Sequence, residues 1–227
     1  AFVSKMLNHQ HDVTGFTLKQ PSAGEFGICE QDGEQYLCVG DELLIATAAL
    51  KIRGQHNYAN ALAALALGAG IGLPMQAMIE ALKEFPGLEH RTQWVAEING
   101  VNWYNDSKGT NVGATLAAIE GLPGKHVLIA GGQGKGADFA PLRDIAVQRL
   151  RAAVLIGDDA DKLAEAFEPV VPVKFAGDMG EAVAVAAELA RQGDNVLLSP
   201  ACASFDMFRG FADRGEVFID AVQGLCS

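Results

Sequence analysis

The sequence predicts an α/β fold in two parts, the second of which is a mostly parallel, Rossmann-like sheet with helices on both faces. Two observations predict this fold. After residue 88, continuous apolar runs alternate with helical patterns, as in a parallel sheet covered on both sides. Before that point, short β-patterned runs come first and two helical patterns follow. We therefore expect one domain over residues 1–87 and another over 88–227.

The elements expected in the first part are short strands and then two helices. Residues 13–45 carry β patterns, and the pair Asp32-Gly33 indicates a hairpin turn. Helical spacing follows, and Pro86-Gly87 ends the second helix. The runs are strands at 13–18, 25–29 and 35–39 and helices at 57–68 and 75–85.

The elements expected in the second part alternate regularly. An alternating strand at 94–98 turns at Asn99-Gly100 into a short strand at 101–104. Further strands are expected at 127–130, 153–156, 170–175 and 195–198, and helices at 112–119, 141–150, 160–167, 180–191 and 218–223. Each parallel crossover should be right-handed.

The composition restricts the partners and the location. The net charge of −11 argues against nucleic acid or an anionic membrane as the main partner. The longest apolar stretch, 61–75, is too short to span a bilayer, so we expect no membrane insertion. Four cysteines without CxxC spacing, and no signal peptide, favour a reducing, cytoplasmic setting. We interpret Cys29 and Cys38 as two free thiols, with a pair across the hairpin as the alternative.

The stretch 105–111 is the most informative part of the chain. Its side chains are a carboxylate, an ammonium, two hydroxyls and two amides: Asn105, Asp106, Ser107, Lys108, Thr110 and Asn111. They lie between the end of a predicted strand and the start of a helix. Ligands bind at that end of an open α/β sheet, and helix N-termini favour anions.

Two other strand ends carry small or polar residues. Gly131–Gly136 resembles a phosphate loop, but it lacks the Ser or Thr of a Walker loop and the GxGxxG of a dinucleotide site. It is either a flexible turn or a loop in which Lys135 supplies a charge beside a ligand. In the run 198–208, Ser199 and Ser204 either cap backbone groups or bind a ligand. Cys202 has no histidine nearby in the sequence to act as its base.

Polar side chains elsewhere leave alternatives open. Arg209 and Arg214 form either a solvated helix face or anion ligands, and His90-Arg91 is either ordinary surface or a ligand site at a hinge. Asn57 and Asn60 share a helix face, where Asn57 suits a cap but Asn60 is a poor interior residue. The histidines make no metal-ligand spacing, so we expect no metal site in this chain.

Five blocks of this chain, in order, resemble the C-terminal part of the Mur ligase family, and most closely its D-glutamate-adding members. The blocks are Gly54–Ala64, Gly87–Arg91, Asn105–Asn111, Gly131–Phe139 and Leu198–Phe208. Residues 1–50 match only loosely. The resemblance implies ATP-dependent ligation of D-glutamate to UDP-N-acetylmuramoyl-L-alanine through an acyl phosphate, in peptidoglycan precursor synthesis, with ATP and Mg²⁺ as cofactors.

The resemblance also implies roles for individual residues. Lys108 would lie near the transferring phosphoryl group, and Lys108 and His90 would be the catalytic residues, with His90 beside Arg91 and Asp106 at the ATP. The nucleotide would be held by Asn57, Asn60, Arg91 and Asp106. D-Glutamate would be held by Thr110, Lys135 and Ser204, and the side chain of Phe211 would pack against it. These groups suit a reaction that depends on positioning and charge neutralisation.

The chain departs from the family in what it lacks. It contains no Walker loop ending in Gly-Lys-Ser or Gly-Lys-Thr. We therefore expect residues 1–87 to be the last part of a central ATPase domain, with most Mg²⁺ ligands upstream, and the chain to be inactive alone. The alternative is a stand-alone Rossmann-like module that binds an acidic metabolite or a nucleotide.

Overall fold

The computed structural model describes residues 13–225 of the chain. The chain divides into two compact units, Ala1–Pro86 and Gly87–Ser227, and each is described here by itself. Within residues 13–225, no helix has the length and apolar character needed to cross a membrane.

The first unit is a three-stranded antiparallel sheet with two helices packed against it. The strands pair in the order β1-β2-β3. In chain order the elements are β1 (Phe26–Gln31), β2 (Glu34–Val39), β3 (Glu42–Ala46), a 3-10 turn η2 (Thr47–Ala49), α1 (Gln55–Gly70) and α2 (Met75–Glu84). Asp32 and Gly33 join β1 to β2 with φ angles of 53° and 80°, as the hairpin signal predicts. Phe26, Leu37 and Ile45 project from the strands into a core shared with both helices.

The run 13–18 was expected to be a strand and forms only a single bridge. Phe16 pairs with Phe26, and the backbone contacts of Thr17 and Lys19 with β1 follow no regular ladder. A Cβ at Gly27 would lie 2.6 Å from the carbonyl oxygen of Lys19, so the segment crosses close over β1. The segment hydrogen-bonds to β1 around the Phe16–Phe26 bridge, but the register is lost by Lys19, so no regular strand forms.

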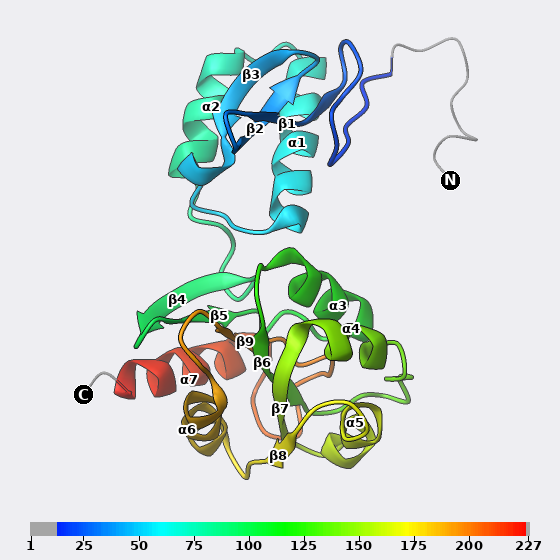
Figure 1. Ribbon diagram of the computed structural model, residues 1–227, viewed down its shortest axis with the longest axis vertical. Helices are drawn as coiled ribbons and strands as arrows, with labels where there is room; N and C mark the ends of the chain where they lie inside the picture. Colours follow the sequence, from blue (N-terminus) through cyan, green and yellow to red (C-terminus); the bar gives the residue numbers. More distant parts are fainter. Residues whose placement is uncertain (1–12, 226–227) are drawn as a thin grey trace. The chain divides into compact units, whose positions relative to one another are not determined.

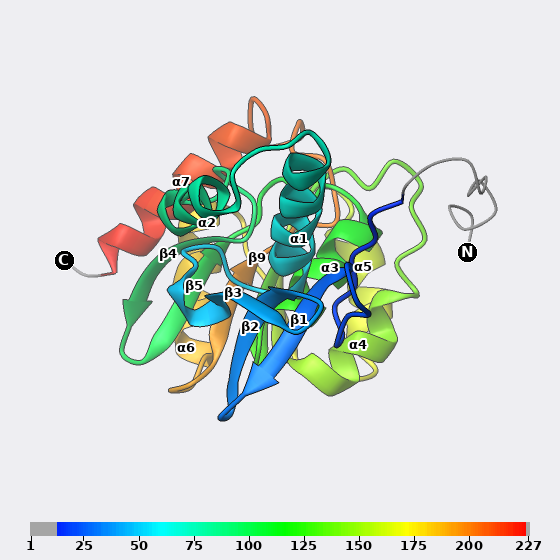
Figure 2. The same cartoon turned by 90° about the horizontal axis from the view of Figure 1, so that it is seen from above.

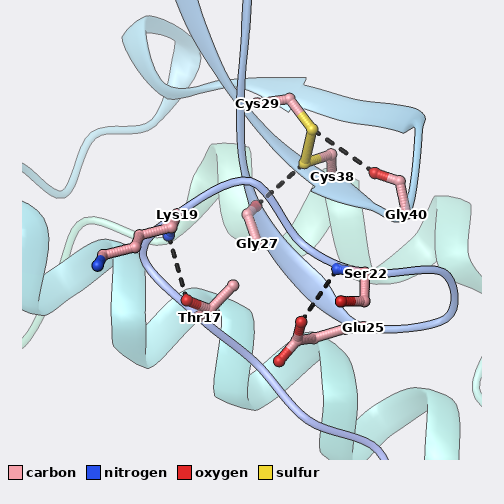
Figure 3. The surroundings of a disulfide bond; sticks show 8 residues. All are labelled: Thr17, Lys19, Ser22, Glu25, Gly27, Cys29, Cys38 and Gly40. Atoms are coloured by element: carbon pink, nitrogen blue, oxygen red, sulfur yellow. Dashed lines mark hydrogen bonds between the residues drawn. A yellow bond between two sulfur atoms is a disulfide. The ribbon is translucent and has the colours of Figure 1, made fainter.

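A disulfide joins Cys29 to Cys38, so the expectation of two free thiols was wrong (Figure 3). The register pairs Cys29 with Tyr36, and Cys38 lies two residues further along β2. The two cysteines are therefore diagonal neighbours on one face of the hairpin, with Cα atoms 6.1 Å apart. Spacing in the sequence does not reveal this pair because the register of the hairpin creates it.

The second unit contains a six-stranded sheet in the order β4-β5-β9-β6-β7-β8. β4 is antiparallel to β5, and the other neighbours are parallel. The strands are β4 (Gln93–Ile98), β5 (Val101–Asn105), β6 (His126–Gly131), β7 (Leu150–Ile156), β8 (Val173–Phe175) and β9 (Asn195–Leu198). The helices are α3 (Val112–Gly121), α4 (Leu142–Arg149), α5 (Ala160–Phe167), α6 (Met179–Leu189) and α7 (Phe211–Gly224).

Helices cover both faces of this sheet, as Figures 1 and 2 show. Along β6, Leu128 and Ala130 point into a core formed with α3, α4 and α5. Val127 and Ile129 point the other way, into a core with α6 and α7. Because successive strand residues alternate between faces, an uninterrupted apolar strand indicates that both faces of the sheet are covered. The predicted α/β fold class is confirmed.

Several element boundaries differ from those expected, and contacts in the structure account for two of them. β8 begins at Val173 because Val170 and Val171 close a turn onto the carbonyl oxygen of Phe167. α7 begins at Phe211 rather than at 218, so Gly215 lies inside the helix. A Cβ at Gly215 would lie 2.2 Å from His90 Nδ1, so this glycine leaves room for the histidine ring.

Candidate functional site

Three polar loops meet at one edge of the six-stranded sheet. They follow the neighbouring strands β5, β9 and β6, and span 106–111, 199–210 and 132–136. The helices that follow β5 and β6 cover one face of the sheet, and α7, which follows β9, covers the other. Where the connections after neighbouring strands run to opposite faces of a sheet, a crevice forms at the carboxyl ends of those strands.

Asp106 lies inside this edge with both carboxylate oxygens engaged. Oδ1 accepts a hydrogen bond from the Thr92 backbone N–H at 3.0 Å, and Oδ2 accepts one from Ser199 Oγ at 2.7 Å. The side chain is 7% exposed. Burial raises the pKa of Asp106 to about 6, against the lowering effects of the Ser199 and Thr92 hydrogen bonds and the Arg91 charge. Asp106 thus fastens the 90–92 turn to the ends of β5 and β9.

Lys108 projects over the ring of Phe211, with Nζ 4.0 Å from the ring centroid. Its backbone N–H donates to the carbonyl oxygen of His90 at 3.0 Å. The His90 ring meets the same phenylalanine edge-on, with centroids 6.1 Å apart. The structure therefore brings together three residues that the sequence placed in one site.

His90 is buried, with 5% of its surface exposed, and its ring is held from several sides. Asn105 Nδ2 lies 3.0 Å from His90 Nδ1 and also donates to the carbonyl oxygen of Gly215 at 3.1 Å. The backbone of His90 has a φ of 61°, which a non-glycine residue rarely adopts. This environment suits a residue that positions the turn, and the catalytic role expected for His90 stays a prediction.

Arg214 is fully buried, which excludes the solvated helix face that was one of two alternatives for this position. Its guanidinium donates from Nε to Ser107 Oγ at 2.9 Å, from Nη2 to Ser107 O at 2.8 Å and from Nη1 to Cys202 O at 3.2 Å. Burial lowers the pKa of Arg214 to about 10. The guanidinium ties the loops after β5 and β9 to α7. Arg209, in contrast, is exposed and pairs with Asp213.

The loop that carries Lys135 is anchored at both sides. Gln133 and Ala203 exchange two backbone hydrogen bonds of 2.9 Å, and the Gly134 N–H donates to Asp159 Oδ2 at 2.7 Å. A Cβ at Gly132 would lie 2.2 Å from the carbonyl oxygen of Ala203, which accounts for this glycine. Lys135 has a φ of 53°, and its Nζ lies 5.9 Å from the centroid of the exposed Phe205 ring.

The remaining residues predicted for this edge differ in accessibility. Thr110 is half-buried just before α3, and Arg91 is exposed on the 90–92 turn. Ser204 is almost fully buried, and its carbonyl oxygen accepts the Phe208 N–H at 2.8 Å. Asn111 caps α3 by accepting the Ala114 N–H.

Cys202 is a structural residue in this arrangement. It is fully buried, and burial together with the nearby Asp159 raises its pKa to about 12. A thiol with that pKa stays protonated and is a poor nucleophile. Ser199 is also buried, and its hydroxyl links Asp106 to Thr115.

Asn57 and Asn60 belong to the first unit and lie on the first turns of α1. Asn57 Nδ2 donates to the carbonyl oxygen of Arg53 at 2.8 Å, and Asn60 is exposed. Gly54, rather than Asn57, is the N-cap of this helix. The roles expected for both asparagines at a nucleotide stay predictions.

Sequence reasoning missed the residues that support this site from behind. Asp159 and Gly215 position the Lys135 loop and His90, but neither lies in a pattern that signals a contact, and Asn105, noted in the polar stretch, had no contact with His90 predicted for it. Asp159 could have been noticed as an acidic residue directly after a buried strand. Gly215 argued against a helix at this position, because a glycine usually weakens a helix.

The part of the chain that forms this edge is similar to known proteins. Residues 90–202 match the family described as Mur ligase, glutamate ligase domain. The UDP-N-acetylmuramoylalanine–D-glutamate ligase of Nitrosococcus oceani is 52% identical over 99% of this chain and 50% of its own length. The ligase of the same name from Pseudomonas putida is 56% identical over 92% of this chain and 48% of its own length. The chain thus spans about half the length of the curated relatives it matches.

Solved structures show the same fold at low sequence identity. MurF from Acinetobacter baumannii superposes with a TM-score of 0.59 at 18% identity, over 87% of this chain and 45% of that one. The UDP-N-acetylmuramate-alanine ligase MurC of Thermotoga maritima gives 0.57 at 17% identity, over 88% and 46%. From the matched domain and the relatives that are more than half identical, the chain belongs to the Mur ligase family.

Proposed function

We propose that this chain is part of an ATP-dependent ligase that joins D-glutamate to UDP-N-acetylmuramoyl-L-alanine in peptidoglycan precursor synthesis. The observation that carries the proposal is the gathering of Lys108, Lys135 and Ser204 at one sheet edge. The relatives that are more than half identical to the chain are named as D-glutamate ligases, which supports the choice of D-glutamate. We further propose a cytoplasmic location, where ATP is available.

Each residue at the edge has a task in this reaction. The ammonium of Lys135 pairs with a carboxylate of D-glutamate, and the hydroxyls of Thr110 and Ser204 orient that substrate. The ammonium of Lys108 neutralises charge that develops on the transferring phosphoryl group. His90 and Phe211 hold this lysine, and Asp106 holds the turn that bears Arg91.

The residues present fit part of a nucleotide site. In the second unit, exposed Arg91 offers a guanidinium to phosphate. The roles of Asn57 and Asn60 in the first unit stay predictions. Asp106 supports this site indirectly, because its carboxylate oxygens already accept hydrogen bonds from Thr92 and Ser199. ATP, when bound, supplies the phosphoryl group that activates a carboxylate.

The residues present do not fit a complete Mg²⁺ site. Across residues 13–225, no group of three His, Cys, Asp or Glu side chains could hold a metal ion. We therefore assign no step at a metal to this chain. Any Mg²⁺ ligands would then come from other parts of a longer protein.

Isothermal titration of the purified 227-residue chain tests the substrate assignment. We expect D-glutamate to bind and Lys135→Ala to abolish that binding, because the substrate loses its ammonium partner. Lys174→Ala, at an exposed position on β8, is the matched control and should bind like the parent chain. Tight binding of NAD without any binding of D-glutamate would contradict the proposal and favour a stand-alone dinucleotide module.

A further inference from the structure

Both lysines of the candidate site face aromatic rings from a single segment. Phe205 and Phe211 belong to the stretch between β9 and the first residue of α7. Lys108 Nζ lies 4.0 Å from the centroid of Phe211, and Lys135 Nζ lies 5.9 Å from that of Phe205. Both distances fall within the roughly 6 Å over which a ring face attracts a cation.

Phe211 is held through both its backbone and its ring. Its carbonyl oxygen accepts a hydrogen bond from Ser107 Oγ at 2.7 Å, and Ser107 in turn accepts one from buried Arg214. The His90 ring meets the phenylalanine edge-on at 78° between planes. A ring fixed in this way offers Lys108 one preferred position for its ammonium.

A ring face holds a cation differently from a carboxylate. A carboxylate would accept the ammonium hydrogens and neutralise the charge, whereas the quadrupole of a ring does neither. Among residues 13–225, the ion pairs found involve neither Lys108 nor Lys135. Their N–H donors and full charges therefore remain available to an anionic ligand.

We propose that Phe211 and Phe205 are positioning residues that hold the ammonium groups of Lys108 and Lys135 in place without neutralising them. This proposal rests on the function proposed above and deepens it. It gives Phe211 a task toward Lys108 rather than packing against D-glutamate alone. The loop between β9 and α7 then sets the positions of both anion-binding charges.

The test uses nuclear magnetic resonance of the lysine side chains in the 227-residue chain, with inorganic phosphate as the probe. Ring currents should shift the Lys108 Hε resonances upfield, and Lys108→Ala identifies them. Phe211→Leu should remove the upfield shift and weaken phosphate binding about fivefold to tenfold. Phe211→Tyr keeps the ring face and should restore both. Phe175→Leu, at a half-exposed phenylalanine on β8, is the matched control and should change neither.

The outcomes separate the two proposals. Unchanged phosphate affinity in Phe211→Leu, with binding lost in Lys108→Ala, would overturn the positioning role and leave the proposed function intact. Unchanged affinity in Lys108→Ala would contradict the role of that lysine in the proposed function, and the positioning proposal would fall with it. Lys108 Hε resonances at ordinary positions in the parent chain would overturn the ring contact itself.

Discussion

The substitution Asp106→Asn should stabilise the second unit at pH 8. Burial raises the pKa of Asp106 from 3.8 to about 6, so the folded state binds a proton more readily than the unfolded state. The stability contributed by this proton is complete below pH 4 and is lost as the pH rises through 6. The shift of about 2 units corresponds to about 3 kcal/mol in the free energy of unfolding.

An asparagine removes the buried charge and keeps the hydrogen bonds. Its Oδ1 can accept from Thr92, and its Nδ2 can donate to Ser199 Oγ, whose hydroxyl then turns toward Thr115 Oγ1 at 3.1 Å. We therefore expect Asp106→Asn to raise the free energy of unfolding at pH 8 by up to about 3 kcal/mol and to change it little at pH 4.

Urea unfolding followed by tryptophan fluorescence measures this effect. Trp94 and Trp103 are the two tryptophans of the chain, and both lie in the second unit. Asp138→Asn is the matched control, because this exposed side chain accepts the Ala140 N–H and an asparagine can do the same. A variant that is no more stable than the parent at pH 8, or equally stabilised at pH 4, would show that the buried charge of Asp106 does not destabilise the second unit.

Three further changes test the supports of the site and the first unit. Gly215→Ala should destabilise the second unit by about 2–3 kcal/mol, because the added Cβ would collide with His90. Gly224→Ala is the control and should not, because the space around Gly224 is open. The midpoints of urea unfolding measure both effects. Arg214→Lys should cost about 2–3 kcal/mol by the same assay, because an ammonium cannot reproduce the guanidinium contacts to Ser107 and Cys202; an unchanged midpoint would contradict this. Reducing the Cys29–Cys38 disulfide should lower the stability of the first unit by about 2–3 kcal/mol, measured by circular dichroism, and Cys38→Ala should abolish the response to reductant.

The sequence predicted the sheet because its apolar runs are local signals. β6, β7 and β9 are buried on both faces, and continuous apolar runs record that burial directly. The hairpin at Asp32-Gly33 was also predictable, because few residues adopt its φ angles. The strand order, with β9 between β5 and β6, depends on contacts between distant segments and left no local signal.

The lysines of the site were predictable from the sequence, and the buried residues that support the site were not. Lys108 and Lys135 were found because polar residues at strand ends carry a chemical signal. The burial of Arg214 was not predicted, because a charged residue on a helix is usually exposed and a solvated helix face was one of its two alternatives. Its burial depends on three oxygen acceptors that two distant loops bring together. The Cys29–Cys38 pair was considered only as the alternative for a similar reason, since register rather than spacing aligns the two residues.

The most direct test of the central claim is D-glutamate-dependent ATP hydrolysis by a full-length ligase that carries this chain, assayed with UDP-N-acetylmuramoyl-L-alanine. We predict turnover that requires D-glutamate, and a loss of at least about a hundredfold in both Lys108→Ala and Lys135→Ala, because the first removes the charge proposed for the phosphoryl group and the second the ammonium partner of D-glutamate. Lys174→Ala should retain parent activity. Unchanged kinetics in both Lys108→Ala and Lys135→Ala, or hydrolysis that ignores D-glutamate, would contradict the account.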